Sequence, residues 1–261
     1  MNKINKYYRL CLFFLITNCS HPIDYFYKEV RKYGYIHYTT PLRYSGTGTL
    51  IGGQPSSMKI ISHPHTCFPE EIEGQKTNLR FKDETTLPNR YENFSINSDL
   101  QIDFFEIVAK GFPSIKAGVK MSEVKNLVVQ FHGVHVEYID SIRLVQFYRD
   151  SMPDICKEYL DHIGFIVQAI KVDSMRFILY NKKEGAISLT MENIKQYFDF
   201  SWDIDWKIEK GTELIISTPK YIGYQLGGLR KNSQGLSFWR ATSVKNDRWI
   251  FKHIGVYGDS E

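Results

Sequence analysis

The sequence lacks the short motifs that would assign an enzymatic function directly. It has no Gly-x-Ser-x-Gly nucleophile elbow, and the glycines at 46, 48, 52 and 53 fit neither the dinucleotide-binding fingerprint nor the Walker spacing. We interpret those glycines as tight turns or bulges between strands. Internal repeats and low-complexity segments are also missing. An enzyme is therefore disfavoured, although not excluded, and the sequence predicts no cofactor.

The chain also has only a small excess of one charge over the other. The formal net charge is +4, and three basic residues, Lys3, Lys6 and Arg9, lie close to the N-terminus. Without residues 1–18, 30 basic groups stand against 29 acidic ones. A nearly neutral chain without basic runs is not expected to bind nucleic acid, and it has no polybasic membrane tether.

The N-terminus has the order of an export signal. A basic start is followed by the apolar run Leu10–Ile16, which is far too short to cross a bilayer, since a spanning helix takes about 20 residues. This order is typical of a secretory signal peptide. We predict that residues 1–18 are a signal peptide, so the protein is exported. The alternatives are a hydrophobic helix that packs on the body and a conventional signal peptide that is cleaved nearby.

The next residues resemble the lipobox of bacterial lipoproteins. The segment Ile16–Cys19 places an apolar residue three positions before a cysteine and a small residue two positions before it. Asn18 departs from the Gly, Ala or Ser that is usual there. The resemblance implies a lipoprotein whose N-terminal Cys19 carries acyl chains such as palmitate, with membrane lipid as its partner. Ser20 then implies an anchored protein of the cell envelope, at the outer membrane or facing the periplasm.

Only two cysteines are left without an assignment. Of the four, Cys11 would be lost with the signal peptide and Cys19 would be lipidated. Export places Cys67 and Cys156 in an oxidising compartment, where they could form a disulfide. The alternative is two separate buried thiols.

The hydrophobic pattern predicts an α+β fold with a mostly antiparallel sheet and a few short helices, in one domain over residues 19–261. We expect hairpin turns at Asp173-Ser174 and Asn246-Asp247. The expected helices are 23–32, 99–110, 140–161 with a break near Pro153, and 190–198. The expected strands are 35–38, 59–62, 79–82, 119–121, 126–132, 134–138, 165–172, 176–180, 186–189, 202–208, 213–217, 221–226, 236–244 and 248–257.

One cluster suggests a metal site. In an extended segment, His63, His65 and Cys67 would face the same side, and two imidazoles with a thiolate could bind zinc or copper. Pro64 lies inside this segment, and a disulfide would consume the thiol of Cys67. The alternative is that both histidines are polar loop residues.

A second segment suggests a ligand groove. Tyr221 and Tyr224 are three positions apart, with Gly223 between them and two more glycines following. Aromatic side chains on an adaptable backbone suit recognition of a small molecule or protein. The alternative is an edge strand with a bulge.

The body of the chain resembles the bacterial gasdermins in the order of its elements and in a few residue types. The resemblance rests on residues 32–35, Pro41-Leu42, 117–122, and the strand 165–171 that follows a helical stretch. It implies an α+β protein that carries a lipidated cysteine near its N-terminus and forms membrane pores after proteolysis. Two departures are the outward-directed leader and the glycine-rich stretch 46–53, which has no counterpart in that family.

Three functions follow from the sequence. The first is a non-enzymatic envelope lipoprotein with a binding domain whose ligand is an unknown protein or small molecule. The second is a lipid-anchored pore-former resembling the gasdermins. The third is an envelope hydrolase or metal-dependent enzyme that uses the region of residues 63–67.

Overall fold

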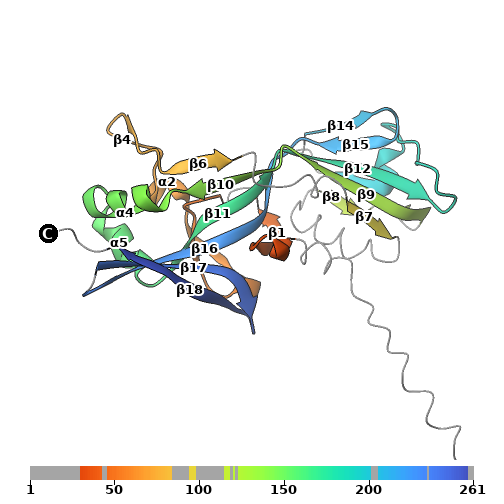
Figure 1. Cartoon of the computed structure of the whole chain (residues 1–261). Coiled ribbons are helices and arrows are strands. Elements are labelled where there is room, and N and C mark those ends of the chain that lie inside the picture. Colours follow the sequence, from red (N-terminus) through yellow and green to blue (C-terminus); the bar gives the residue numbers. More distant parts are fainter. Residues whose placement is uncertain are drawn as a thin grey trace, which may run out of the picture.

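The computed structural model describes residues 30–42, 46–83, 94–97, 115–117, 120, 123–200, 205–233 and 235–257. Over these residues the protein is an α+β protein in which every strand pairing is antiparallel, as the sequence predicts (Figure 1). None of the helices in these ranges is long and apolar enough to cross a membrane.

The larger sheet has nine strands and includes the C-terminal part of the chain. Its main path is β18-β17-β16-β11-β10-β6, while β1 pairs with β16, and β2 pairs with β11 and β3. The strands are β1 (Ile36–Leu42), β2 (Leu50–Gly52), β3 (Lys59–Ser62), β6 (Arg80–Asp83), β10 (His135–Ile139), β11 (Gly164–Val172), β16 (Lys220–Asn232), β17 (Gly235–Lys245) and β18 (Arg248–Tyr257).

The smaller sheet has five strands in the order β14-β15-β12-β9-β7. These are β7 (Phe94–Asn97), β9 (Val124–His132), β12 (Ser174–Asn181), β14 (Trp206–Glu209) and β15 (Glu213–Ile216). Two further pairs are β4 (Glu71–Ile72) with β5 (Gln75–Lys76), and β8 (Ile115–Ala117) with β13 (Phe198–Phe200). The short helices are η1 (Pro55–Ser57), α2 (Pro64–Cys67), α4 (Ser141–Asp150), α5 (Asp154–Leu160) and α6 (Ile194–Tyr197).

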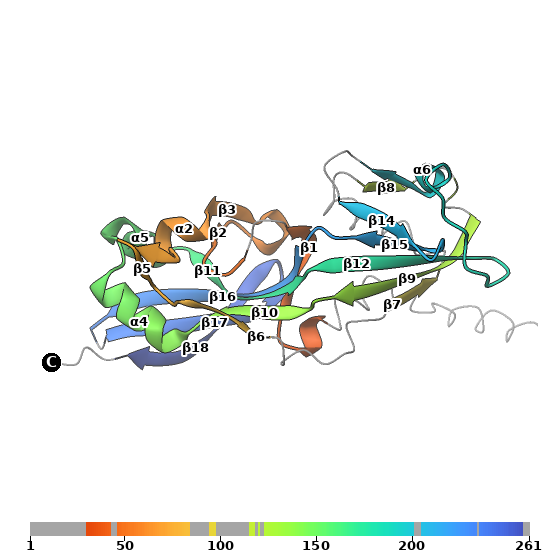
Figure 2. The ribbon, with the colours of Figure 1, turned by 90° about the horizontal axis from the view of Figure 1, so that it is seen from above.

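The two sheets are joined by three neighbouring strands that run from one sheet into the other. Strand β9 continues into β10, β11 into β12, and β15 into β16, with at most three residues between them. The strands keep the same order on both sides, and Figure 2 shows the two sheets end to end along these strands. We call this junction the bend.

Local sequence explains the helices beside the larger sheet. The carboxylate of Asp140 accepts a hydrogen bond from the backbone N of Arg143 at 2.8 Å, which caps the start of α4. Pro153 cannot donate a backbone hydrogen bond, so the first helix ends before it and α5 begins after it. The predicted break near Pro153 is confirmed.

The core has three buried clusters. One lies between the smaller sheet and the segment 187–198, and it extends to Ile170, Val172 and Ile222 at the bend. The second packs α4 and α5 against one face of the larger sheet, with Phe165 and Phe238 among its members. The third includes Tyr38, Tyr224 and Leu226.

One predicted hairpin is confirmed and the other is wrong. Asn246 and Asp247 both have positive φ, 49° and 54°, as a two-residue turn between β17 and β18 requires. Asp173-Ser174 is not a hairpin turn, because β11 and β12 do not pair with each other. Instead the chain passes directly from one sheet to the next, and the backbone N of Asp173 donates to the carbonyl of His132 at 3.0 Å.

Other predictions differ at the edges of elements. The strand expected at 186–189 is wrong, because only Ala186 forms an isolated bridge, with Tyr180. The helix expected at 190–198 shortens to α6, because residues 198–200 pair as a strand with β8. The expected helix 99–110 lies outside the described residues, as does most of the expected helix 23–32.

Candidate functional site

A cluster of charged and polar side chains lies beside the bend, with Glu137 at its centre. The hydroxyl of Tyr221 donates to Oε2 of Glu137 at 2.7 Å. The ammonium of Lys171 donates to Oε1 at 3.2 Å, and Nε2 of His135 lies 3.8 Å from the same oxygen. The side chains of Glu137 and His135 are only 21% and 4% exposed, so the cluster is largely shielded from water.

The sequence places these residues on three adjacent strands. His135 and Glu137 are two positions apart on β10, so both side chains point to the same face of the sheet. Strand β11 lies between β10 and β16, and its Lys171 is paired in register with His135 on one side and Tyr221 on the other. The Lys171 ammonium also lies 5.4 Å from the centre of the Tyr221 ring, within the range of a cation–π contact.

The surroundings fix the carboxyl of Glu137 in its charged form. Burial alone would raise the pKa of this group, but His135, Tyr221 and Lys171 together lower the pKa from 4.5 to about 2. Burial and the neighbouring carboxylate of Glu137 raise the pKa of the Tyr221 hydroxyl. Neither group titrates near neutral pH, so Glu137 and Tyr221 are better suited to holding strands together than to proton transfer.

Two glycines shape the backbone around this cluster. A Cβ at Gly46 would collide with the hydroxyl of Tyr221 and lie 3.2 Å from Oε2 of Glu137. Gly133, in the link from β9 to β10, has φ of +63°, and a Cβ there would collide with the carboxylate of Asp173. The carbonyl of Gly133 contacts Nδ1 of His135 at 2.8 Å. A side chain at position 46 would therefore displace Tyr221, and one at position 133 would meet both a collision and backbone strain.

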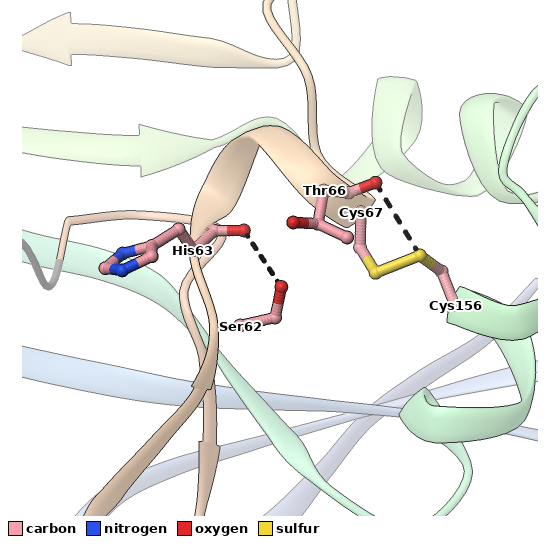
Figure 3. The surroundings of a disulfide bond; sticks show 5 residues. All are labelled: Ser62, His63, Thr66, Cys67 and Cys156. Atoms are coloured by element: carbon pink, nitrogen blue, oxygen red, sulfur yellow. Dashed lines mark hydrogen bonds between the residues drawn. A yellow bond between two sulfur atoms is a disulfide. The ribbon is translucent and has the colours of Figure 1, made fainter.

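The two predicted cysteines are bonded to each other. The Cys67–Cys156 disulfide joins α2 to α5, with the two Cα atoms 5.5 Å apart and both residues buried (Figure 3). The two cysteines are 89 positions apart in the sequence, so the disulfide ties the N-terminal part of the larger sheet to its covering helices.

The predicted metal site does not form. The segment from Pro64 to Cys67 is a helical turn instead of an extended strand, and the disulfide removes the thiolate that would bind a metal. The rings of His63 and His65 are stacked with their centres 5.8 Å apart. In the part of the chain that the structure describes, no three His, Cys, Asp or Glu side chains are grouped to hold a metal ion.

Tyr221 and Tyr224 do not line a groove. They lie on β16 in the interior of the larger sheet, where they are 8% and 1% exposed. The ring of Tyr224 packs against Tyr38 at 4.6 Å, and its hydroxyl accepts a hydrogen bond from Nε1 of Trp249 at 3.0 Å. Burial raises the pKa of Tyr224 to about 12. The edge-strand alternative is wrong as well, because this part of β16 pairs with β11 on one side and with β1 on the other.

A basic and partly apolar surface at the C-terminal strands was not predicted. Residues 226–257 contain six Lys and Arg residues and a single acidic one, Asp247, whose carboxylate accepts a hydrogen bond from the backbone N of Ser56 at 2.8 Å. Ile250, Ile254 and Val256 on β18 are 37%, 51% and 39% exposed. A count of charges in windows along the chain would have found this segment, whereas the near-neutral total conceals it.

Comparisons with known proteins add a distant structural likeness. No protein-family model matches the chain, and no curated protein is similar to it at a significant level. Among solved structures, a bacterial gasdermin from Bradyrhizobium tropiciagri is similar with a TM-score of 0.44 and 10% sequence identity, over 86% of this chain and 88% of that chain. At this score and identity the likeness assigns neither a family nor an activity. Cys19, the predicted lipid site, lies outside the described residues.

Proposed function

We propose that this protein permeabilises membranes by inserting strands of its smaller sheet, the second of the three functions that the sequence allows. The observation that carries the proposal is the amphipathic character of that sheet. One face of β9, β12 and β15 is apolar, with Phe131, Phe177 and Leu214 in a single cluster. Trp206 and Ile208 of β14 pack against the same cluster.

The opposite face of the same strands carries charged side chains beside apolar ones, Ile178 and Ile215. Arg176 of β12 lies 3.3 Å from the carboxylate of Glu213 on β15 and 3.7 Å from that of Glu209 on β14. Lys210 forms a further ion pair with Glu213 at 3.2 Å. Strands with one apolar face and one face that carries ion pairs can turn the first to lipid and the second to water, provided that nothing else covers the apolar face.

In the described residues the apolar face is covered by one segment of the chain. Ile187, Leu189, Ile194, Tyr197 and Phe198 pack on it and belong to the same cluster. We call residues 187–198 the cover. Displacement of the cover would expose an apolar surface spanning four strands, which would be unstable in water and stable in a bilayer.

The bend supplies the length that insertion needs. Residues 164–181 form β11 and β12 with only Asp173 between them, and 124–139 form β9 and β10 around a two-residue link. A strand that crosses a bilayer takes about 9–11 residues, so either continuous segment is long enough once the bend straightens. The predicted lipid on Cys19 and the basic surface of β16–β18 would hold the protein at the membrane beforehand.

Leakage of a trapped dye from liposomes tests the function. The protein should release dye with anionic vesicles, and limited proteolysis should increase the rate. A failure to release dye under every condition, intact or cleaved, would sink the proposal and leave the binding domain as the remaining prediction.

A crosslink tests the part played by the cover. Tyr180 and Ala186 are paired across a β-bridge, so cysteines at both positions lie close enough to form a disulfide. The oxidised Tyr180→Cys/Ala186→Cys protein should leak dye several-fold more slowly than the same protein after reduction. Wild type with and without reductant is the matched control, because it carries the Cys67–Cys156 disulfide. Equal leakage from the oxidised and reduced variants would contradict displacement of the cover.

A further inference from the structure

A small hollow lies where the C-terminal strands meet the chain after α5. It has a volume of about 250 Å³. Gly228 on β16, Trp239 on β17, and Trp249 and Phe251 on β18 line it from the sheet. Residues 160–164 and 51–53 close its other sides. None of the three functions derived from the sequence uses this hollow.

Gly228 creates the space between two aromatic walls. A Cβ at this position would lie 3.6 Å from Cε1 of Phe251 and 3.8 Å from Cβ of Trp239, in ordinary contact with both. The backbone of Gly228 is not in the left-handed region, so a larger residue could occupy it and would fill the hollow. The absent side chain therefore leaves a slot whose two sides are aromatic.

Trp249 forms a third aromatic wall, and a hydrogen bond from its indole holds it in place. Nε1 of Trp249 donates to the hydroxyl of Tyr224 at 3.0 Å, which fixes the orientation of its indole ring. Trp239 differs, because its Nε1 is buried without a hydrogen-bond partner among the described residues. Because that nitrogen is buried, a ligand in the hollow would contact the ring of Trp239 and not its N–H.

The rim of the slot carries a cation. Arg230 lies two residues beyond Gly228 on β16, on the same face, and its guanidinium is 5.7 Å from the centre of the Trp239 ring. Across the described ranges no carboxylate forms an ion pair with Arg230. Asp161, also at the rim, accepts a hydrogen bond from the backbone N of Lys231 at 3.4 Å.

We propose that this hollow binds a small monoanionic aromatic acid, with its ring between Trp239 and Phe251 and its carboxylate on Arg230. Aromatic walls favour a flat ring in an offset or edge arrangement, and a guanidinium pairs with a carboxylate through two parallel hydrogen bonds. Ligand pockets for drug-sized molecules measure about 300–1,000 Å³, so this hollow suits a ligand with one ring. Arg230 is the one Lys or Arg among the described residues that line the hollow, which matches a ligand with one negative charge.

Three probes separate the two parts of this recognition. Benzoate has the ring and the charge, cyclohexanecarboxylate has the charge without a flat ring, and benzyl alcohol has the ring without the charge. Ligand-observed NMR and calorimetry on the full chain should show benzoate binding at least several-fold more tightly than either of the others. Equal binding of the two carboxylates would reduce the site to a surface charge, and no benzoate binding would overturn the proposal.

Variants then locate the binding. Gly228→Val fills the slot and should abolish benzoate binding, and Arg230→Gln should weaken it while leaving benzyl alcohol unaffected. Gly255→Val is the matched control, because a Cβ at Gly255 on β18 meets no atom within 4 Å. Thermal unfolding checks that each variant is folded, and the exposed Arg230 gives a test even where Gly228→Val is unstable. Benzoate affinity that survives both substitutions would overturn the proposal.

Discussion

The hydroxyl of Tyr221 on β16 donates to the carboxylate of Glu137 on β10, although strand β11 lies between the two. The bond passes over Lys171 of β11, whose ammonium contacts the same carboxylate at 3.2 Å. Three strands that run on into the smaller sheet are thus joined by side chains as well as by their backbones.

Tyr221→Phe should lower the free energy of unfolding by about 1.5–3 kcal/mol, since a hydrogen bond to a buried charged group is lost. Denaturant unfolding measures the difference. Tyr159→Phe is the matched control, because Tyr159 is 48% exposed and should change stability very little. Equal effects of the two substitutions would show that the Tyr221–Glu137 contact contributes nothing.

The contribution of Glu137 should depend on pH in one direction. The pKa of its carboxyl falls from 4.5 to about 2 on folding, so the unfolded state takes up the proton first as pH falls. The stabilising contribution is fully present above pH 4.5 and is lost as pH falls through about 2; it amounts to about 3 kcal/mol.

Unfolding of wild type and Glu137→Gln at several pH values measures this effect. The difference between them should be constant from pH 7 to about pH 5 and shrink steadily below pH 4.5. A difference that stays constant down to pH 2, or that grows with acidity, would contradict the assignment.

Gly133→Ala should destabilise the bend. The positive φ of +63° strains any residue with a Cβ, and the new methyl group collides with the carboxylate of Asp173. We expect a loss of about 1–3 kcal/mol in unfolding free energy. The double variant Gly133→Ala/Asp173→Ala should recover part of the loss, because it removes the collisions with the carboxylate but keeps the Cβ of residue 173, 2.8 Å away, and the backbone strain. A double variant no more stable than Gly133→Ala would show that the carboxylate contributes nothing to the loss.

Removal of the disulfide should lower stability by about 4 kcal/mol in the chain-entropy model, given the length of the loop that it closes. The Cys67→Ala/Cys156→Ala protein is the test, because both positions are buried and alanine adds no polar atom. Its melting temperature should match that of fully reduced wild type. A reduced wild type much less stable than the variant would mean that the buried thiols themselves destabilise the fold.

Local signals predicted the elements that depend on local chemistry. The break at Pro153 follows from a missing donor, and the turn at Asn246-Asp247 follows from residues that tolerate positive φ. The strand Lys59–Ser62 was predicted with the observed bounds. Asp173-Ser174 carries a similar turn signal but connects the two sheets directly. The backbone N of Asp173 donates to the carbonyl of His132, which is distant in sequence.

The candidate site could not be predicted in this way. Glu137 and Tyr221 are 84 positions apart, and they meet only because β10 and β16 both flank β11. The prediction at Tyr221 and Tyr224 identified a genuine concentration of aromatic residues but took buried side chains for ligand-facing ones. The cysteine pairing was accessible because elimination left two thiols, whereas the histidine cluster failed because one of those thiols was already used.

The three crossings at the bend also constrain how this protein could exchange parts with another. A chimera that takes its smaller sheet from a second parent needs four junctions: one between residues 83 and 94, and three at the crossings between residues 132 and 135, 172 and 174, and 216 and 220. A single recombination point would leave at least one crossing strand with neighbours from the other parent. We therefore expect relatives of this protein to keep the two sheets together and to vary mainly in the loops that do not pass through the bend.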